Sequence, residues 1–116
     1  MKISIKREVL ESCLVGSQNT HPKEFHGLLS GVVKSDSIIV ETLFVTPLFG
    51  SSSFNVGLSL VGTFQSNPTG AAIPLRTGPT YSRTRQGILF VASYPYTVAN
   101  VHAFDPSGKE INFEIV

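Results

Sequence analysis

The sequence is informative first through what it contains little of. Its single cysteine, Cys13, excludes a disulfide framework within the chain and a CxxC zinc site. Charged residues make up only 15% of the chain, against about 25% in average usage, so we expect a partner or a second copy to cover part of the surface. A formal net charge of +1 provides no overall attraction to nucleic acid or to an anionic membrane.

Two further absences concern location. The first residues, MKISIKREVLES, carry charges where a secretory signal peptide needs its apolar region. No stretch approaches the ~18 consecutive apolar residues of a membrane-spanning helix. Together with a single cysteine, which suits a reducing compartment, these features predict a soluble cytoplasmic protein with no membrane partner.

Hydrophobic residues are plentiful, at 41% of 116 residues, which is enough to build the core of one domain over residues 1–116. Apolar residues at helical spacing predict one amphipathic helix over residues 5–17. Cys13 lies on the apolar side of that helix, so we expect it to be a small buried hydrophobic residue and not a nucleophile.

About six segments have the composition of strands: residues 26–33, 37–45, 56–64, 87–94, 98–104 and 109–116. The first two are separated by a turn at residues 34–37, which predicts a hairpin. Residues 105–108 have the sequence of a type I turn, and residues 81–86 are expected to form a short helical turn. In the last segment Ile111, Phe113 and Ile115 alternate with polar residues, which predicts one buried and one exposed face. The fold class is therefore α+β around a mostly β core.

The stretch VGTFQSNPTGAAIPLRTGPT, residues 61–80, leaves a strand and crosses two turns rich in proline and glycine. It resembles the rim of an active site, yet it contains no His, Asp, Glu or Cys. A loop of this kind therefore offers almost no side chain that could perform chemistry.

Three stretches together resemble the JAMM/MPN (JAB1/MPN/Mov34) metalloprotease family, in particular its small archaeal members. They are HPKEFHGLLSG at residues 21–31, VGTFQSNPTGAAIPLRTG at residues 61–78, and the tail that begins GILFVASYPY at residue 87. The resemblance covers nearly the whole chain. It implies an MPN/JAB-like (cytidine-deaminase-like) mixed β-sheet of about six strands with an N-terminal helix and one short helix.

In active members of this family two His and one Asp hold zinc, a Glu is the general base, and a Ser helps to hold the oxyanion. The substrate is an isopeptide or peptide bond, usually next to ubiquitin or a ubiquitin-like protein. Here Glu24 stands at the general-base position, but Gln65 and Asn67 stand at the two His positions. Leu75 stands at the Ser position and Gly78 at the Asp position. The flanking residues that match the family pattern are Val61, Gly62, Pro68 and Pro74.

These substitutions remove the chemistry that the resemblance would otherwise imply. Zinc prefers imidazole, thiolate or carboxylate ligands, and the amides of Gln65 and Asn67 are neutral oxygen donors. Without the ion no bound water has its pKa lowered toward ~7, and Leu75 cannot donate a hydrogen bond to an oxyanion. We therefore expect no active catalytic residue, no metal and no cofactor. Gln65 and Asn67 are expected to bond Glu24 or nearby backbone.

Our first hypothesis is a pseudoenzyme that serves in protein–protein interaction or as a scaffold. By the resemblance its partner would be a second copy, another MPN-domain subunit or a ubiquitin-like protein. The alternative is a zinc-dependent isopeptidase with rearranged ligands. His21 and His26 flank Glu24, and a replacement site would use Glu24, His26 and His102. In the simplest interpretation Glu24 is a hydrogen-bonded carboxylate at the start of a strand.

Two other features leave alternatives open. Arg76, Arg83 and Arg85 surround Tyr81 and could contact nucleic acid or an acidic partner, but the near-neutral chain favours a solvated loop and argues against nucleic acid. The Ser-rich segment at residues 49–54 is either a mobile loop or a partner-docking loop.

Overall fold

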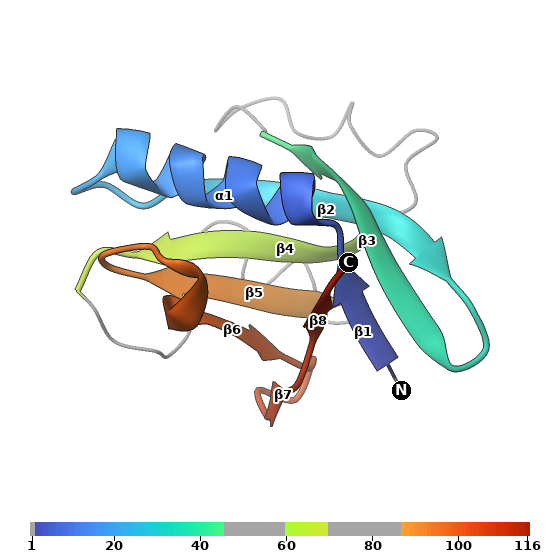
Figure 1. Cartoon of the computed structure of the whole chain (residues 1–116). Helices are drawn as coiled ribbons and strands as arrows, with labels where there is room; N and C mark the ends of the chain where they lie inside the picture. The colour runs from blue at the N-terminus through green and yellow to red at the C-terminus, as the bar shows by residue number, and fades with distance from the viewer. Residues whose placement is uncertain (1, 46–59, 70–86) are drawn as a thin grey trace.

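A computed structural model describes residues 2–45, 60–69 and 87–116. Within these ranges a single α-helix runs along one face of a curled, mixed β-sheet (Figure 1). The elements are β1 (Lys2–Ile5), α1 (Arg7–Thr20), β2 (His26–Val33), β3 (Ser37–Phe44), β4 (Leu60–Asn67), β5 (Ile88–Ser93), a 3-10 turn η3 (Val98–Asn100), β6 (Val101–Phe104), β7 (Glu110–Ile111) and β8 (Glu114–Ile115). The predicted α+β class is confirmed.

The sheet has the strand order β7-β6-β5-β4-β2-β3-β1-β8. Strands β2 and β3 form the predicted antiparallel hairpin, closed by a hydrogen bond from the Lys34 N–H to the Ser37 carbonyl at 2.7 Å. Strands β4 and β5 are parallel, so their carboxyl ends meet at the same end of the sheet. That end carries the candidate site.

The predicted helix over residues 5–17 was misplaced at both ends. Residues 2–5 form strand β1, which pairs in parallel with β3 and buries Ile3 and Ile5. Lys6 has an extended backbone and separates β1 from α1, which then continues to Thr20. The sequence KISI alternates apolar and polar residues as a strand does, and the apolar spacing from Ile5 onward concealed that signal.

The prediction of about six strands was too low, since the described residues form eight. The tail, expected as one strand over residues 109–116, forms two short strands on opposite edges of the sheet, because β7 pairs with β6 and β8 pairs with β1. The predicted strand at residues 98–104 begins with the turn η3. Strand β4 continues to Asn67, beyond the predicted end at residue 64.

The expected helical turn at residues 81–86 and the segment 49–54 lie outside the described residues.

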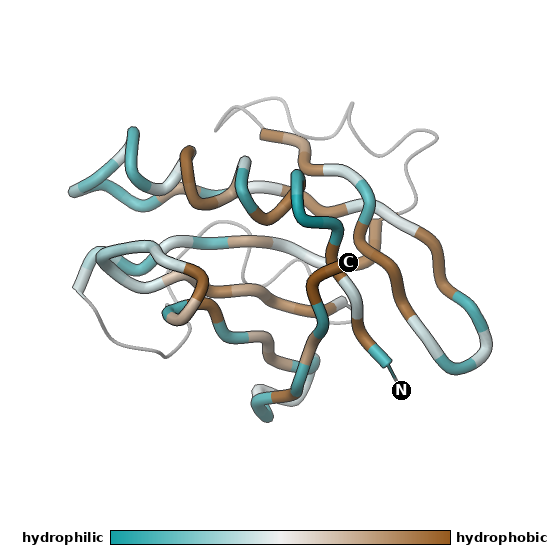
Figure 2. The backbone as a smooth tube through the Cα atoms, in the orientation of Figure 1, coloured by the Kyte–Doolittle hydropathy of each residue, from teal (hydrophilic) through white to brown (hydrophobic). Residues whose placement is uncertain are grey.

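The main core fills the space between α1 and the sheet, where the apolar stretches of the chain converge (Figure 2). Its most buried members include Ile5, Leu10, Cys13, Leu29, Val40, Phe64 and Phe90. A second, smaller cluster of Leu89, Val91 and Phe104 lies on the other face of the sheet. Strand β5 is buried on both faces, and so is β4 after its first residue.

Glycine allows the backbones to approach closely at two points in the sheet. A Cβ atom on Gly62 would collide with the carbonyl oxygen of Ile88 on the neighbouring strand β5. A Cβ atom on Gly31 would collide with the carbonyl oxygen of Ile39 in the same way. Any side chain at either position would force a strand to move, because the colliding atom belongs to the backbone.

Candidate functional site

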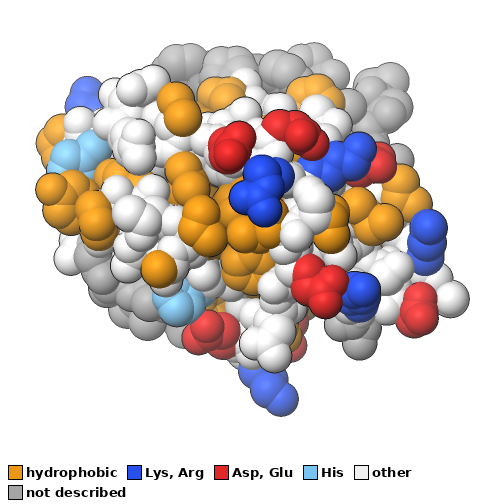
Figure 3. Space-filling model, in the orientation of Figure 1, with side chains coloured by type: hydrophobic (Ala, Val, Ile, Leu, Met, Phe, Trp, Pro, Cys, Tyr) orange, Lys and Arg blue, Asp and Glu red, His pale blue; other side chains and the backbone are white. Residues whose placement is uncertain are grey.

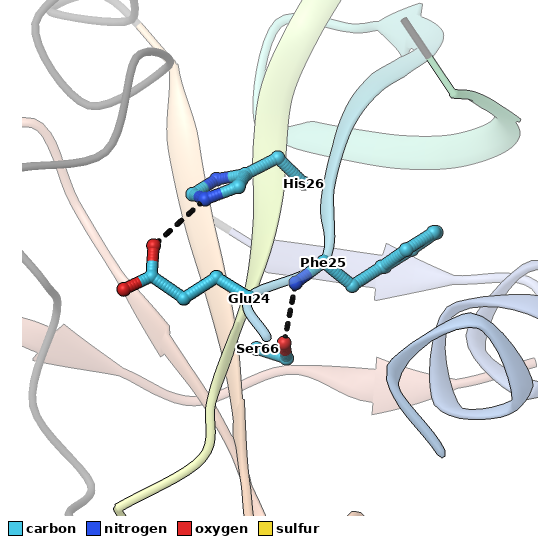
Figure 4. A network of polar contacts seen from close by, with 4 residues as sticks. All are labelled: Glu24, Phe25, His26 and Ser66. Atoms are coloured by element: carbon cyan, nitrogen blue, oxygen red, sulfur yellow. Dashed lines mark hydrogen bonds and ion pairs between the residues drawn. The ribbon is translucent and has the colours of Figure 1, made fainter. Parts of the chain in front are cut away.

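Glu24 and His26 lie at the start of β2, on the sheet face away from α1. The Glu24 Oε1 and His26 Nε2 atoms are 3.0 Å apart. Phe25 points the opposite way (Figure 4) and packs edge-to-face on Phe64, with ring centroids 5.9 Å apart. The alternation of a strand therefore separates the polar pair from the core side chain between them.

Two hydrogen bonds attach the start of β2 to β4. The Phe25 N–H donates to Ser66 Oγ at 2.7 Å, as drawn in Figure 4, and the Ser66 N–H donates to the Phe25 carbonyl at 2.9 Å. Ser66 is fully buried. This attachment fixes the backbone on either side of the Glu24–His26 pair.

Gln65 and Asn67 come from β4 and lie on the same face as His26. His26 pairs directly with Gln65 across the two antiparallel strands, so their side chains project from the same face. Asn67 is two residues further along and shares that face. Both amide side chains are fully buried. The fold thus gathers Glu24, His26, Gln65 and Asn67 at one end of the sheet.

Asn67 organises the turn that follows β4. Its Oδ1 atom accepts hydrogen bonds from the Thr69 N–H at 3.1 Å and from the Thr69 hydroxyl. Its own carbonyl accepts a bond from the Tyr94 N–H at 3.0 Å. The expectation that Asn67 bonds nearby backbone is confirmed. The oxygen that this amide could offer to a metal is engaged in an Asx turn.

His102 does not lie near the pair formed by Glu24 and His26. A row of paired residues runs from His26 through Gln65 and Val91 to His102, so His102 is three strand spacings, roughly 14 Å, from His26. His102 Nδ1 instead lies 2.7 Å from Glu110 Oε2. The hypothesis of a metal site shared by His26 and His102 is therefore wrong.

The donors present at this site do not fit zinc. Glu24 and His26 provide one carboxylate and one imidazole, and these contact each other. No group of three or more His, Cys, Asp or Glu within residues 2–45, 60–69 and 87–116 could hold a metal ion. The motif positions Leu75 and Gly78 lie outside the described ranges, as do the arginines at 76, 83 and 85.

A cluster of three rings beside this end of the sheet was not predicted. His21 stacks on Tyr94, with centroids 4.7 Å apart, and its Nδ1 atom lies 2.7 Å from the Tyr96 hydroxyl oxygen. Tyr96 is buried. Its backbone adopts a left-handed conformation with φ 66°, which is uncommon for a bulky residue. Burial, and secondarily the Tyr94 phenol, raise the pKa of Tyr96. The only local signal was the sequence YPY, residues 94–96, directly at the end of the strand predicted over residues 87–94.

The surface in Figure 3 shows acidic and basic side chains interspersed, and hydrophobic side chains spread over this face, including its left side toward the C-terminal end of α1. Near that end Tyr94 is 52% exposed and Val98 is 48% exposed. The one helix in the described ranges is too short and too polar to cross a membrane.

No family model matches this chain, and no curated protein matches it. Solved structures do. The JAB1/MPN domain protein AF2198 from Archaeoglobus fulgidus is 27% identical with a TM-score of 0.75, and the match covers 100% of this chain and 99% of that one. A structure of the JAMM metalloprotease-like zinc site in the proteasome and signalosome is 24% identical, with the same TM-score and coverage.

A third structure, protein DSY2949 from Desulfitobacterium hafniense, is 17% identical with a TM-score of 0.64, covering 97% of this chain and 91% of that one. At 24% and 17% identity these two matches show the fold alone. The likeness to AF2198 extends over the full length of both chains and agrees with the curled mixed sheet and its single described helix. The chain therefore has the fold of the JAB1/MPN domain and is similar over its whole length to a JAB1/MPN domain protein.

Proposed function

We propose that this domain is a catalytically inactive JAMM/MPN-like module, over residues 1–116, that acts by binding another protein. The observation that carries the proposal is the hydrogen bonding of the Asn67 side chain. The family resemblance assigns this position to a zinc-binding His, and here its amide oxygen caps the turn at Thr69. A structural use of this residue has replaced the metal-binding one.

The other residues at the site support the same proposal. Gln65 offers a neutral amide where zinc would need an imidazole. The Glu24 carboxylate, at the general-base position, lies 3.0 Å from His26. Without a metal ion no water near Glu24 has a lowered pKa, so the carboxylate has no activated nucleophile to deprotonate.

A protein partner is supported by the surface beside the site. Charged residues are few, at 15% of the chain, and Tyr94 and Val98 expose large apolar side chains. The backbone of Tyr94 is bonded to Asn67, so this apolar surface adjoins the former metal position. We propose a second copy, another MPN-domain subunit or a ubiquitin-like protein as the partner, in the cytoplasm.

A zinc titration followed by calorimetry tests the loss of the metal site. We expect the chelator-stripped protein to give no binding heat at neutral pH and the protein as purified to contain no zinc. The matched variant Q65H/N67H/G78D restores the three ligand types that the family uses. We expect this variant to bind zinc at a 1:1 ratio, because it regains two imidazoles and a carboxylate.

One observation favours the alternative, a zinc isopeptidase with rearranged ligands: Glu24 and His26 bring a carboxylate and an imidazole together. Stoichiometric zinc with submicromolar affinity in the unmodified chain, abolished by His26→Ala, would establish that alternative. Zinc-dependent cleavage of a ubiquitin isopeptide substrate, lost in Glu24→Gln, would extend it to catalysis. Separately, a strict monomer in light scattering at micromolar concentration would eliminate the homodimer.

A further inference from the structure

A hollow of about 490 Å³ lies at the end of the sheet opposite the candidate site. Strands β4 and β5 begin there, and β1, the hairpin β2–β3 and the β6–β7 turn complete its wall. Small-molecule sites typically measure about 300–1,000 Å³ and have mainly apolar walls. Eight of the nine residues that line this hollow are apolar.

The apolar wall has a buried floor and an exposed rim. Ile3, Val61 and Ile88 form the floor and are 3%, 5% and 6% exposed. Val33 and Leu60 stand at the rim and are 63% and 40% exposed. Exposed large apolar side chains that adjoin a concave apolar surface mark a place where a ligand can remove hydrocarbon from water.

Asp105 is the one charged residue among those lining the hollow. Its Oδ1 atom accepts hydrogen bonds from the Ser107 N–H at 2.9 Å, the Ser107 hydroxyl at 2.6 Å and the Lys109 N–H at 3.0 Å. Its Oδ2 atom has no hydrogen bond or ion pair with any described residue. These bonds, the Ser107 hydroxyl foremost, lower the pKa of Asp105, so its charge is retained at neutral pH.

We infer that this hollow binds a small amphiphilic cation, an alkyl or aryl group that carries an ammonium. The hydrocarbon part lies against the apolar floor, and the ammonium lies at the free Oδ2 atom of Asp105. The turn holds the carboxylate in place through Oδ1 before any ligand arrives, so little side-chain order is lost on binding. The inference is independent of the proposed function, because the hollow and the candidate site occupy opposite ends of β4 and β5.

Three ligands with the same eight-carbon chain test this inference: n-octylammonium, n-octanol and n-octanoate. Each is titrated into the protein while the methyl resonances of Ile3, Ile38 and Ile111 are followed by NMR. We expect octylammonium and octanol to shift these methyl resonances in a saturable way, and octanoate not to do so. Octylammonium should bind about three- to fivefold more tightly than octanol, the modest preference expected for an exposed charge pair.

Asp105→Asn is the matched variant, because the amide oxygen of Asn can still accept the bonds that form the turn while the charge is lost. We expect octylammonium to bind this variant no more tightly than octanol does, with octanol affinity unchanged. An amide spectrum like that of the unmodified protein shows that the fold is intact. Leu60→Ser serves as a second variant and should weaken both ligands equally.

Three results would overturn the inference. Equal affinities for octylammonium, octanol and octanoate would leave no role for Asp105. If Asp105→Asn does not weaken the binding of octylammonium, Asp105 likewise has no role in binding. A lack of saturable shifts with every ligand would show that the hollow is not a binding site.

Discussion

Adjacent residues on β4 show how differently the two faces of the sheet are built. Phe64 and Gln65 are both fully buried. Phe64 faces α1 and belongs to the main apolar core, whereas Gln65 faces the other way, where Thr63 and Asn67 are also buried. Apolar packing dominates the first face. Buried polar groups need hydrogen-bond partners and add little to a core, so the second face is where function, present or lost, is to be sought.

The largest difference between the faces should appear in core truncations. We expect Phe64→Ala to lower the free energy of unfolding by about 3–5 kcal/mol, because it opens a cavity in the main core and removes the contact with Phe25. Phe104→Ala, in the smaller cluster on the other face, should cost less. Denaturation in urea measures both. Equal losses would mean that the two faces contribute alike to stability.

An effect of intermediate size concerns Cys13, which lies on the α1 face. Burial raises the pKa of this thiol from 9.0 to about 12, opposed in part by a backbone hydrogen bond. The folded state therefore keeps the thiol protonated at pH values where the unfolded chain ionises. The contribution of Cys13 to the free energy of unfolding is therefore fully present below about pH 9. It should fall by about 1.4 kcal/mol per pH unit between about pH 9 and about pH 12.

Cys13→Ala is the control for that slope, since tyrosines and lysines also titrate above pH 9 in both proteins. The difference in the free energy of unfolding between the two proteins should shrink as the pH rises from about 9 to about 10.5. A difference that stays constant over this range would show that the thiol is not buried from solvent.

The smallest effect tests the polar face. Asn67→Ala removes the acceptor of two hydrogen bonds from Thr69 and should cost about 1–2 kcal/mol. Thr69→Val removes the hydroxyl donor and keeps the N–H donor, so it should cost less than Asn67→Ala does. If Asn67→Ala leaves urea denaturation unchanged, the turn does not need this residue, and its burial would instead indicate a retained ligand site.

Sequence patterns predicted the local parts of the fold and missed the distant ones. The β2–β3 hairpin was recognised because its alternation and its turn lie within about twenty residues of each other. Strand β1 was missed because four residues carry a weak signal and its partners β3 and β8 are remote in sequence. The tail was expected as one strand because its alternation is continuous, and only the curled sheet divides it between two edges.

The candidate site was predicted in part for the same reasons. The motif positions Glu24, Gln65 and Asn67 were identified, and strand alternation explains why they share a face. That His102 lies three strands from His26 required the strand order, which no local pattern contains. The ring cluster joins His21 with Tyr94 and Tyr96, and residues so far apart in sequence leave no common motif.

The pairing of β1 with β8 also constrains how the protein can form during synthesis. Ser4 pairs with Glu114, and the Val116 N–H donates to the Ile5 carbonyl. Closing a loop of this length carries an entropic cost that must be met before the contact can stabilise the chain. A ribosome-bound chain that lacks residues 114–116 leaves β1 as an uncovered strand edge, where a neighbouring chain can pair with it. Folding of the sheet is thus completed only after these residues leave the ribosome.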